Sequence, residues 1–231
     1  MSDDTVVISV LNRIELIRLY DQYFSSNKKN SCRKMYNAIM LSVERCPYCG
    51  GIGVPKNLDH YLPKALFPHF SILPLNLIPS CRDCNMGEKR SKFSSKEREQ
   101  IIHPYIDNAC FYNDQWIKAR IVNKMSVPPY FSVEYFVDTL NWGVVEKDRA
   151  LYHFEIFDLA KKYSIQAASE ISTPINCRRQ LFPRENDERF KSFLLSTAGG
   201  FHPNHWKSVL YQCLANDDWF LNCKFKHVVE L

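Results

Sequence analysis

The chain has 231 residues and a formal net charge of +5. Hydrophobic residues make up 45% and charged residues 24%, which is typical of a globular protein with one domain, or one domain and a sizeable appendage. No run of about 18 apolar residues occurs, which argues against a membrane-spanning helix. The first residues are acidic and lack a basic region and a small-residue cleavage site, so we expect no secretion signal and a cytoplasmic location.

Apolar residues at helical spacing, and short apolar runs bounded by Gly and Pro, predict the elements of the first hundred residues. In chain order these are a helix over 10–24, a helix near 33–44, a strand ending near His60, a strand over 76–79 and a helix from Asp83 to about Lys92. A glycine-rich turn precedes the first strand, and a proline-rich irregular stretch follows it. This order of strand, loop, strand and helix would bring His60, Asn76 and Asn85 together.

The second half of the chain is predicted to begin with a strand pair and to continue as helices, so the fold class is α+β. The strands cover 116–122 and 131–137, and helical patterns cover 147–171, 185–197 and 204–214. We divide the chain into an N-terminal helical segment (1–43), a core (44–93) and an α-rich appendage with the strand pair (94–231). The appendage has no net charge and many aromatic residues, which favours the docking of a protein partner.

Four of the nine cysteines form two C-x2-C pairs separated by 31 residues: Cys46, Cys49, Cys81 and Cys84. Zn²⁺ prefers thiolate ligands, and one tight C-x2-C turn lets two sulfurs reach the same ion. Four thiolates leave no open position for water, so the predicted zinc is structural. A set of ordinary core cysteines is the alternative. The other five have no framework spacing and are expected to stay reduced: Cys32, Cys110, Cys177, Cys213 and Cys223.

Polar residues between and beside these cysteines have the chemistry of a second site. In the pair Asp59-His60, the imidazole could take a proton from water and the carboxylate could bind a divalent metal. Asn85 directly follows the last cysteine, and its amide oxygen could share that metal with Asp59. Asn76 is expected to hydrogen-bond the loop that carries His60 and to orient the imidazole. The alternatives are a common dipeptide and ordinary turn or cap asparagines.

The positive charge is concentrated around these residues. Residues 28–105 contain 13 Lys and Arg against 6 Asp and Glu, whereas residues 106–231 contain 15 of each kind. A basic surface attracts phosphate backbones through counterion release, so nucleic acid is the expected partner. A solvated basic face is the alternative.

The string CPYCG…LDHYLPK…NLIPSCRDCN resembles the HNH endonucleases, whose fold is a ββα-metal finger, here with zinc knuckles. The resemblance covers about residues 44–93. It implies that His60 is the general base, that Asp59 and Asn85 hold a catalytic Mg²⁺ or Mn²⁺, and that Asn76 is the middle Asn of the motif. The third letter of the motif is Asn rather than His, a variant that still supplies a ligand.

The resemblance also implies a cation that contacts the phosphate. Lys89 lies four residues after Asn85, where the family often has a lysine at three. Lys89, Arg90 and Lys64 therefore remain the candidates for this contact.

A longer string, DHYLPKALFP with SILPLNLIPSCRDCN and a following HPY, is similar to the HNH subunits of Septu-type and retron-associated anti-phage systems. This similarity implies a defence nuclease that works with an ABC-type ATPase. The substrate could be DNA or RNA, including tRNA. The competing hypotheses are a non-catalytic zinc-ribbon module that binds nucleic acid and an adaptor with a degenerate finger. Binding alone needs neither His60 nor a divalent metal, and cleavage needs both.

Overall fold

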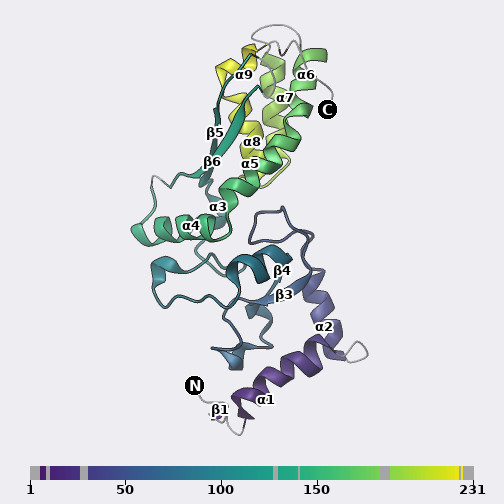
Figure 1. The fold of residues 1–231 in the computed structure, drawn as a ribbon, viewed down its shortest axis with the longest axis vertical. Helices are drawn as coiled ribbons and strands as arrows, with labels where there is room; N and C mark the ends of the chain where they lie inside the picture. The colour runs from purple at the N-terminus through teal and green to yellow at the C-terminus, as the bar shows by residue number, and fades with distance from the viewer. Residues whose placement is uncertain are drawn as a thin grey trace. The chain divides into compact units, whose positions relative to one another are not determined.

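Two units, Met1–Asp107 and Asn108–Leu231, make up the computed structural model (Figure 1). It describes residues 6–8, 11–26, 31–126, 130–139, 141–182, 188–223 and 225. Both units combine helices with small antiparallel sheets, so the predicted α+β class is confirmed. Among the helices in these ranges, none is both long enough and apolar enough to pass through a bilayer.

In the first unit, helices precede and follow a central strand pair. Strand β3 (Asn57–His60) pairs antiparallel with β4 (Leu77–Ser80), so that His60 lies opposite Leu77. The other elements are β1 (Val6–Ile8), β2 (Leu11–Asn12), α1 (Arg13–Arg18), η1 (Leu19–Ser25), α2 (Ser31–Met40), η2 (Pro68–Phe70), η3 (Pro74–Asn76), η4 (Asp83–Lys89) and η5 (Glu97–Glu99). Segments η1 and η4 are π-helical, and η2, η3 and η5 are single 3₁₀ turns.

The first helix begins at Arg13 rather than at residue 10 because Asn12 caps it. The Asn12 side chain accepts a hydrogen bond from the Glu15 amide at 3.0 Å, and the Glu15 carboxylate accepts one from the Asn12 amide at 2.8 Å. This reciprocal capping box satisfies two amide groups that no helical carbonyl can reach. The helix then continues directly into the π-helical turns of η1.

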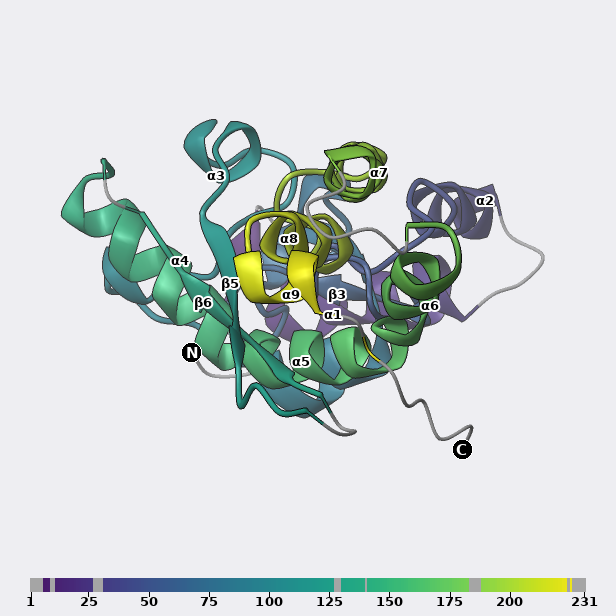
Figure 2. The same ribbon diagram turned by 90° about the horizontal axis from the view of Figure 1, so that it is seen from above.

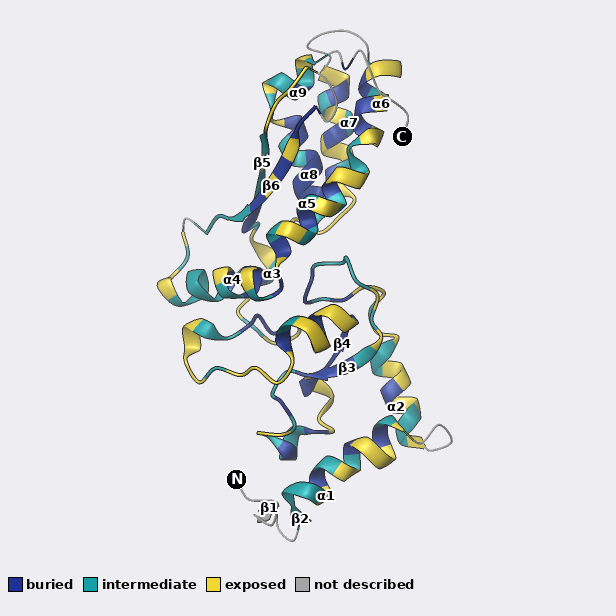
Figure 3. Cartoon of the chain, in the orientation of Figure 1, coloured by how far each residue is buried: buried dark blue, intermediate teal, exposed yellow. Residues whose placement is uncertain are grey.

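A cluster of buried side chains joins the N-terminal helices to one face of the strand pair. Its members come from η1, α2, β3 and β4, and they are Tyr20, Phe24, Tyr36, Leu58 and Leu77. Figure 3 colours the buried residues of these elements dark blue. Burial of one large apolar side chain is worth about 1.5–3 kcal/mol. The cluster is therefore strong enough to hold η1 and α2 against β3 and β4.

The second unit is built on a strand pair with full antiparallel register. Strands β5 (Ile117–Val122) and β6 (Ser132–Val137) lie close to the two predicted ranges. Helix α8 packs against β5 and helix α5 against β6 (Figure 2). The helices of this unit are α3 (Cys110–Asn113), α4 (Val144–Ile156), α5 (Leu159–Glu170), α6 (Ser172–Gln180), α7 (Glu188–Gly199), α8 (Trp206–Ala215) and α9 (Asp218–Asn222).

The helical pattern predicted over 147–171 is interrupted between α4 and α5. Asp158 has a left-handed backbone with φ of 49°, which no α-helix accommodates. The preceding residue, Phe157, is completely buried. Asp tolerates the left-handed region better than most residues, so the chain can turn here without the Gly or Pro that would have revealed the break in the sequence.

Candidate functional site

The four knuckle cysteines form one buried cluster in the first unit. Their sulfur atoms all lie within 4.8 Å of one another. Four sulfurs around a tetrahedral zinc with bonds of about 2.3 Å are about 3.8 Å apart, so the donor type, number and spacing fit. The cluster could therefore bind zinc, as the sequence indicated. It would join the turn before β3 to the start of η4.

The turn that carries the first cysteine pair is shaped by three glycines. Gly50 and Gly51 have φ of 56° and 96°, in the region that favours glycine. The Gly53 amide donates a hydrogen bond to the Sγ of Cys49 at 3.2 Å, which favours a thiolate there. A Cβ atom on Gly53 would lie 2.4 Å from the Cβ and 2.5 Å from the Sγ of Cys81. Only glycine fits between the two knuckles.

Hydrogen bonds among the four thiols of the cluster shift their pKa values. Hydrogen bonds from neighbouring thiols lower the pKa of Cys81 and of Cys49. The same shared bonds raise the pKa of Cys46 and of Cys84. Zinc would bind all four cysteines as thiolates and replace their protons.

Strand β3 presents different side chains on its two faces because successive residues alternate. Asn57 and Asp59 face η4, where they contact Asn85 and Lys89. Leu58 belongs to the hydrophobic cluster on the other face, and His60 also points there, toward Tyr20 of η1. Asp59 and His60 are therefore adjacent in the chain but lie on opposite faces of the strand.

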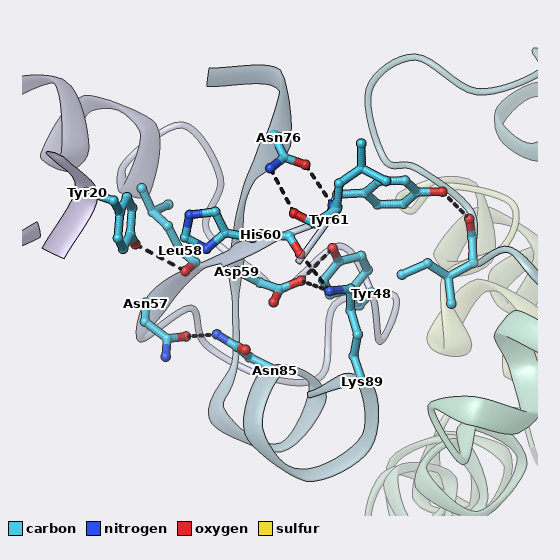
Figure 4. A network of polar contacts seen from close by, with 12 residues as sticks. Tyr20, Tyr48, Asn57, Leu58, Asp59, His60, Tyr61, Asn76, Asn85 and Lys89 are labelled. Atoms are coloured by element: carbon cyan, nitrogen blue, oxygen red, sulfur yellow. Dashed lines mark hydrogen bonds and ion pairs between the residues drawn. The ribbon is translucent and has the colours of Figure 1, made fainter. Parts of the chain in front are cut away.

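Asp59 is buried in a polar network with Lys89 and Tyr48 (Figure 4). The Lys89 ammonium lies 2.9 Å from the Oδ2 of Asp59, and the Tyr48 hydroxyl donates a hydrogen bond of 2.9 Å to the same atom. Lys89 also donates to the carbonyl of His60 at 2.7 Å. Burial raises the pKa of Asp59, while Lys89 opposes this shift. With only 1% of its surface exposed, Lys89 is a buried counterion rather than a surface cation.

The π-helical form of η4 explains why Lys89 lies four residues after Asn85. The Arg90 amide donates to the Asn85 carbonyl at 2.7 Å, a bond that spans five residues. One wide turn of this kind adds a residue to the helix and returns the next side chain to the same face. Asn85 and Lys89 can therefore contact Asn57 and Asp59, two positions apart on β3.

The orientation of the Asn85 amide is set by Asn57. The Nδ2 group of Asn85 donates a hydrogen bond of 3.0 Å to the Oδ1 of Asn57 (Figure 4). This bond turns the carbonyl oxygen of Asn85 away from Asn57. An amide oxygen and the carboxylate of Asp59, on the same side of β3, are hard oxygen donors of the kind that Mg²⁺ and Mn²⁺ prefer.

His60 is held at the end of β3 by a backbone carbonyl and an aromatic ring. Its Nε2 lies 2.9 Å from the carbonyl oxygen of Ser71. Since a carbonyl only accepts hydrogen bonds, Nε2 carries the proton and Nδ1 has the free electron pair. The Tyr20 ring meets the imidazole edge-on at 4.3 Å between ring centroids. Burial lowers the pKa of His60 to about 4, so the ring is uncharged at neutral pH.

Asn76 closes the loop between His60 and Ser71. Its Oδ1 accepts from the Leu62 amide at 2.7 Å, and its Nδ2 donates to the carbonyls of Leu62 and Phe70 at 3.1 and 3.0 Å. These three bonds join both ends of the loop to the residue that precedes β4. The loop in turn carries the Ser71 carbonyl that orients His60.

Four residues of this site were not predicted from the sequence as site residues. Asn57 could have been found, because it precedes Asp59 by two positions on a predicted strand and must share its face. Tyr48 lies inside the first cysteine turn, where nothing in the pattern marks it. Tyr20 and Ser71 reach His60 from distant segments, and only the tertiary structure brings them there.

Comparison with known proteins gives two similar chains. No family model and no solved structure matches the chain. It is 38% identical, in an alignment of 231 residues, to protein ea31 of Escherichia phage lambda, and the alignment covers 94% of this chain and 76% of that protein. It is also 33% identical over 93 residues to the Septu protein PtuB of Bacillus thuringiensis, across 37% of this chain and 35% of that protein.

The close packing at Gly53 leads to a prediction about zinc. We expect Gly53→Ala to weaken zinc binding by about tenfold and to lower the free energy of unfolding by about 1–3 kcal/mol, because the new methyl group would push Cys81 out of the cluster. Gly87→Ala is the matched control, since a Cβ there would meet nothing within 4 Å. Competition with a chromogenic chelator and urea unfolding measure the two quantities. Equal values for the two variants would contradict this account.

The low pKa of His60 predicts a pH dependence of stability. Between pH 6.5 and about 4, the unfolded chain binds a proton at His60 that the folded chain does not. The free energy of unfolding should therefore fall as the pH drops through this window, by about 2–3 kcal/mol between about pH 7.5 and 4.5. His60→Gln should lack this component, and protonation of the cysteines affects both proteins alike. Urea unfolding at the two pH values measures the free energy of unfolding of both proteins. If this free energy fell by the same amount in His60→Gln as in the wild type, the prediction would be refuted.

Proposed function

The chain belongs to the family of protein ea31 of Escherichia phage lambda, and we propose that it is a metal-dependent endonuclease of the HNH type that hydrolyses phosphodiester bonds. One observation carries the proposal. An antiparallel strand pair and a following helix are joined by a four-cysteine cluster, with His60 oriented at the strand end and Asp59 and Asn85 on the helix side. This order of elements supports the proposal of a ββα-metal finger. The local similarity to a Septu protein supports the same proposal.

Asp59 and Asn85 are the residues that would hold a catalytic Mg²⁺ or Mn²⁺. The donor set fits in kind, because a carboxylate and an oriented amide oxygen lie on one side of β3. When bound, such an ion neutralises charge on the scissile phosphate and on the leaving oxygen. Lys89 holds the Asp59 carboxylate in place and opposes the rise in its pKa that burial causes.

His60 would act as the general base. Its Nδ1 has the electron pair that accepts a proton from the attacking water, and Ser71 keeps the proton on Nε2. Asn76 maintains the loop that supplies the Ser71 carbonyl. His60 and Asp59 are consecutive at the end of β3, so a phosphodiester bound at this end would lie near both residues.

The wider role that we propose is a bacterial anti-phage defence effector, as in Septu or retron systems, in the cytoplasm. The excess of basic residues over 28–105 supports a nucleic-acid substrate, either DNA or RNA, with tRNA included. The second unit would dock an ABC-type ATPase partner. Its support is compositional: residues 106–231 have no net charge, whereas the site segment is basic.

A second candidate function is a non-catalytic zinc-ribbon module that binds nucleic acid. The observation in its favour is burial, because Asp59 is 4% and His60 8% exposed, and Asp59 is already paired with Lys89. A binding module would need the basic surface and the cysteine cluster but neither His60 nor a divalent ion.

A cleavage assay separates the two functions. The purified chain is incubated with duplex DNA, single-stranded DNA and total cellular RNA, with Mg²⁺, with Mn²⁺ or without either ion. We expect ion-dependent cleavage of one substrate class and a loss of about 10²–10⁴-fold in His60→Gln, because the general base is removed. Its matched control is His103→Gln, another buried histidine of this unit whose Nε2 also meets a backbone carbonyl, that of Leu75 at 2.9 Å.

Zinc content and far-UV circular dichroism show that both variants fold. Equal cleavage by wild type and His60→Gln would exclude the proposed base. Ion-independent binding without cleavage, also in the presence of co-purifying proteins, would favour the binding module.

A further inference from the structure

Lys64 lies in the loop that follows His60, and its charged group is already engaged. The ammonium forms an ion pair with Asp21 of η1 and lies 5.0 Å from the centre of the Tyr20 ring. Both partners of the pair reach the surface, with 31% of the Lys64 side chain and 48% of the Asp21 side chain exposed. A surface cation four residues from the proposed base is thus neutralised by a carboxylate from the N-terminal helices.

The same helices also cover His60. The Tyr20 ring packs against the imidazole, and the Tyr20 hydroxyl donates to the carbonyl of Leu58 at 3.4 Å (Figure 4). The Ser71 hydroxyl donates to the carbonyl of Leu16 in α1 at 3.0 Å, and the Ser71 carbonyl orients the imidazole. Segment α1–η1 therefore contacts His60 through Tyr20 and through the His60 loop, and only 8% of His60 remains exposed.

The charges favour exchange of the Asp21 carboxylate on Lys64 for a polyanion. Segment α1–η1 has two acidic and two basic residues, so it has no net charge, whereas residues 28–105 are strongly basic. An ion pair at the surface is weak and screened by salt. A nucleic-acid backbone presents many phosphates together and releases counterions when it binds, so it can displace one carboxylate from Lys64.

We propose that Lys64 binds the phosphate backbone of the substrate beside His60, and that Asp21 occupies Lys64 until the substrate arrives. The Asp21 carboxylate is then an electrostatic latch on Lys64 that opens when phosphate replaces it, while the buried cluster keeps η1 packed against β3 and β4. The substrate class rests on the proposed function, whereas the latch requires only that the chain binds a phosphodiester backbone.

Binding assays test the latch independently of cleavage. Fluorescence anisotropy with a labelled DNA duplex of about 25 base pairs and a labelled RNA of about 25 nucleotides, without added Mg²⁺ or Mn²⁺, measures affinity over a range of salt concentrations. The two probes share the phosphodiester backbone and distinguish DNA from RNA as its source. Lys64→Met should weaken binding and reduce the slope of log K against log salt by about one, as expected for the loss of one phosphate contact. Lys64→Arg should retain both.

Asp21→Asn should bind about threefold more tightly, because an exposed ion pair no longer competes with the phosphate. Its matched control is Glu99→Gln, which removes the same charge from another exposed pair of this unit, that of Lys96 and Glu99. This control should change the affinity much less. The double variant D21N/K64M should bind like Lys64→Met alone, because the carboxylate acts only through that lysine.

Several results would overturn the proposal. One is a slope of log K against log salt that is unchanged in folded, zinc-loaded Lys64→Met. Another is an equal change in affinity in Asp21→Asn and Glu99→Gln. The third is that neither the wild type nor Asp21→Asn binds the labelled DNA or RNA. If the wild-type chain did not cleave but the variants changed the affinity as expected, only the proposed hydrolytic function would be refuted. The latch and the nuclease can therefore fail separately.

Discussion

The four-cysteine cluster is the constraint on which the rest of the first unit depends. It joins the glycine turn before β3 to the end of β4 and the first turn of η4, elements that are too short to hold one another by their own hydrogen bonds. Two residues of β3 then contact two residues of η4, in the pairs Asn57–Asn85 and Asp59–Lys89. These two pairs follow from the position of η4, which Cys81 and Cys84 fix, and the bond from Tyr48 to Asp59 follows from the turn between Cys46 and Cys49.

Asp59 combines a structural role with a proposed chemical one. Removal of one partner from a buried ion pair leaves the other charge without compensation, which typically destabilises a protein by about 3–5 kcal/mol. Loss of the Asp59 carboxylate would leave Lys89 charged at 1% exposure, beside the Tyr48 hydroxyl. A change in activity after substitution of Asp59 would therefore mix the loss of a ligand with the loss of packing between β3 and η4. Asn85 gives a cleaner test of the proposed metal ligation, because its side chain is partly exposed and donates its hydrogen bond to Asn57.

The parts of this site that follow local rules could be predicted from the sequence. Cysteines at C-x2-C spacing mark the cluster, and short apolar runs mark the two strands that lie within one or two residues of the expected ranges. The remainder depends on contacts that no local pattern encodes. Tyr20 lies 40 positions before His60, and the π-helical turn of η4 becomes visible only as the bond from Arg90 to Asn85. The break at Asp158 was missed because it uses a left-handed aspartate in place of glycine.

Two lysines flank His60, and burial decides what each can do. Lys89 is enclosed between β3 and η4. If it left Asp59, both charges would remain buried without a partner in a protein interior that solvates them poorly. Lys89 therefore has a structural role and keeps Asp59 as its partner. Lys64 is partly exposed, and water or another anion can replace Asp21 at little cost. Any electrostatic contact with an incoming phosphate must be made by groups that can exchange partners. The sequence position of Lys89 within the motif is therefore less informative than its solvent exposure. Of the two lysines beside His60, Lys64 in the loop after β3 is the one whose positive charge can exchange partners.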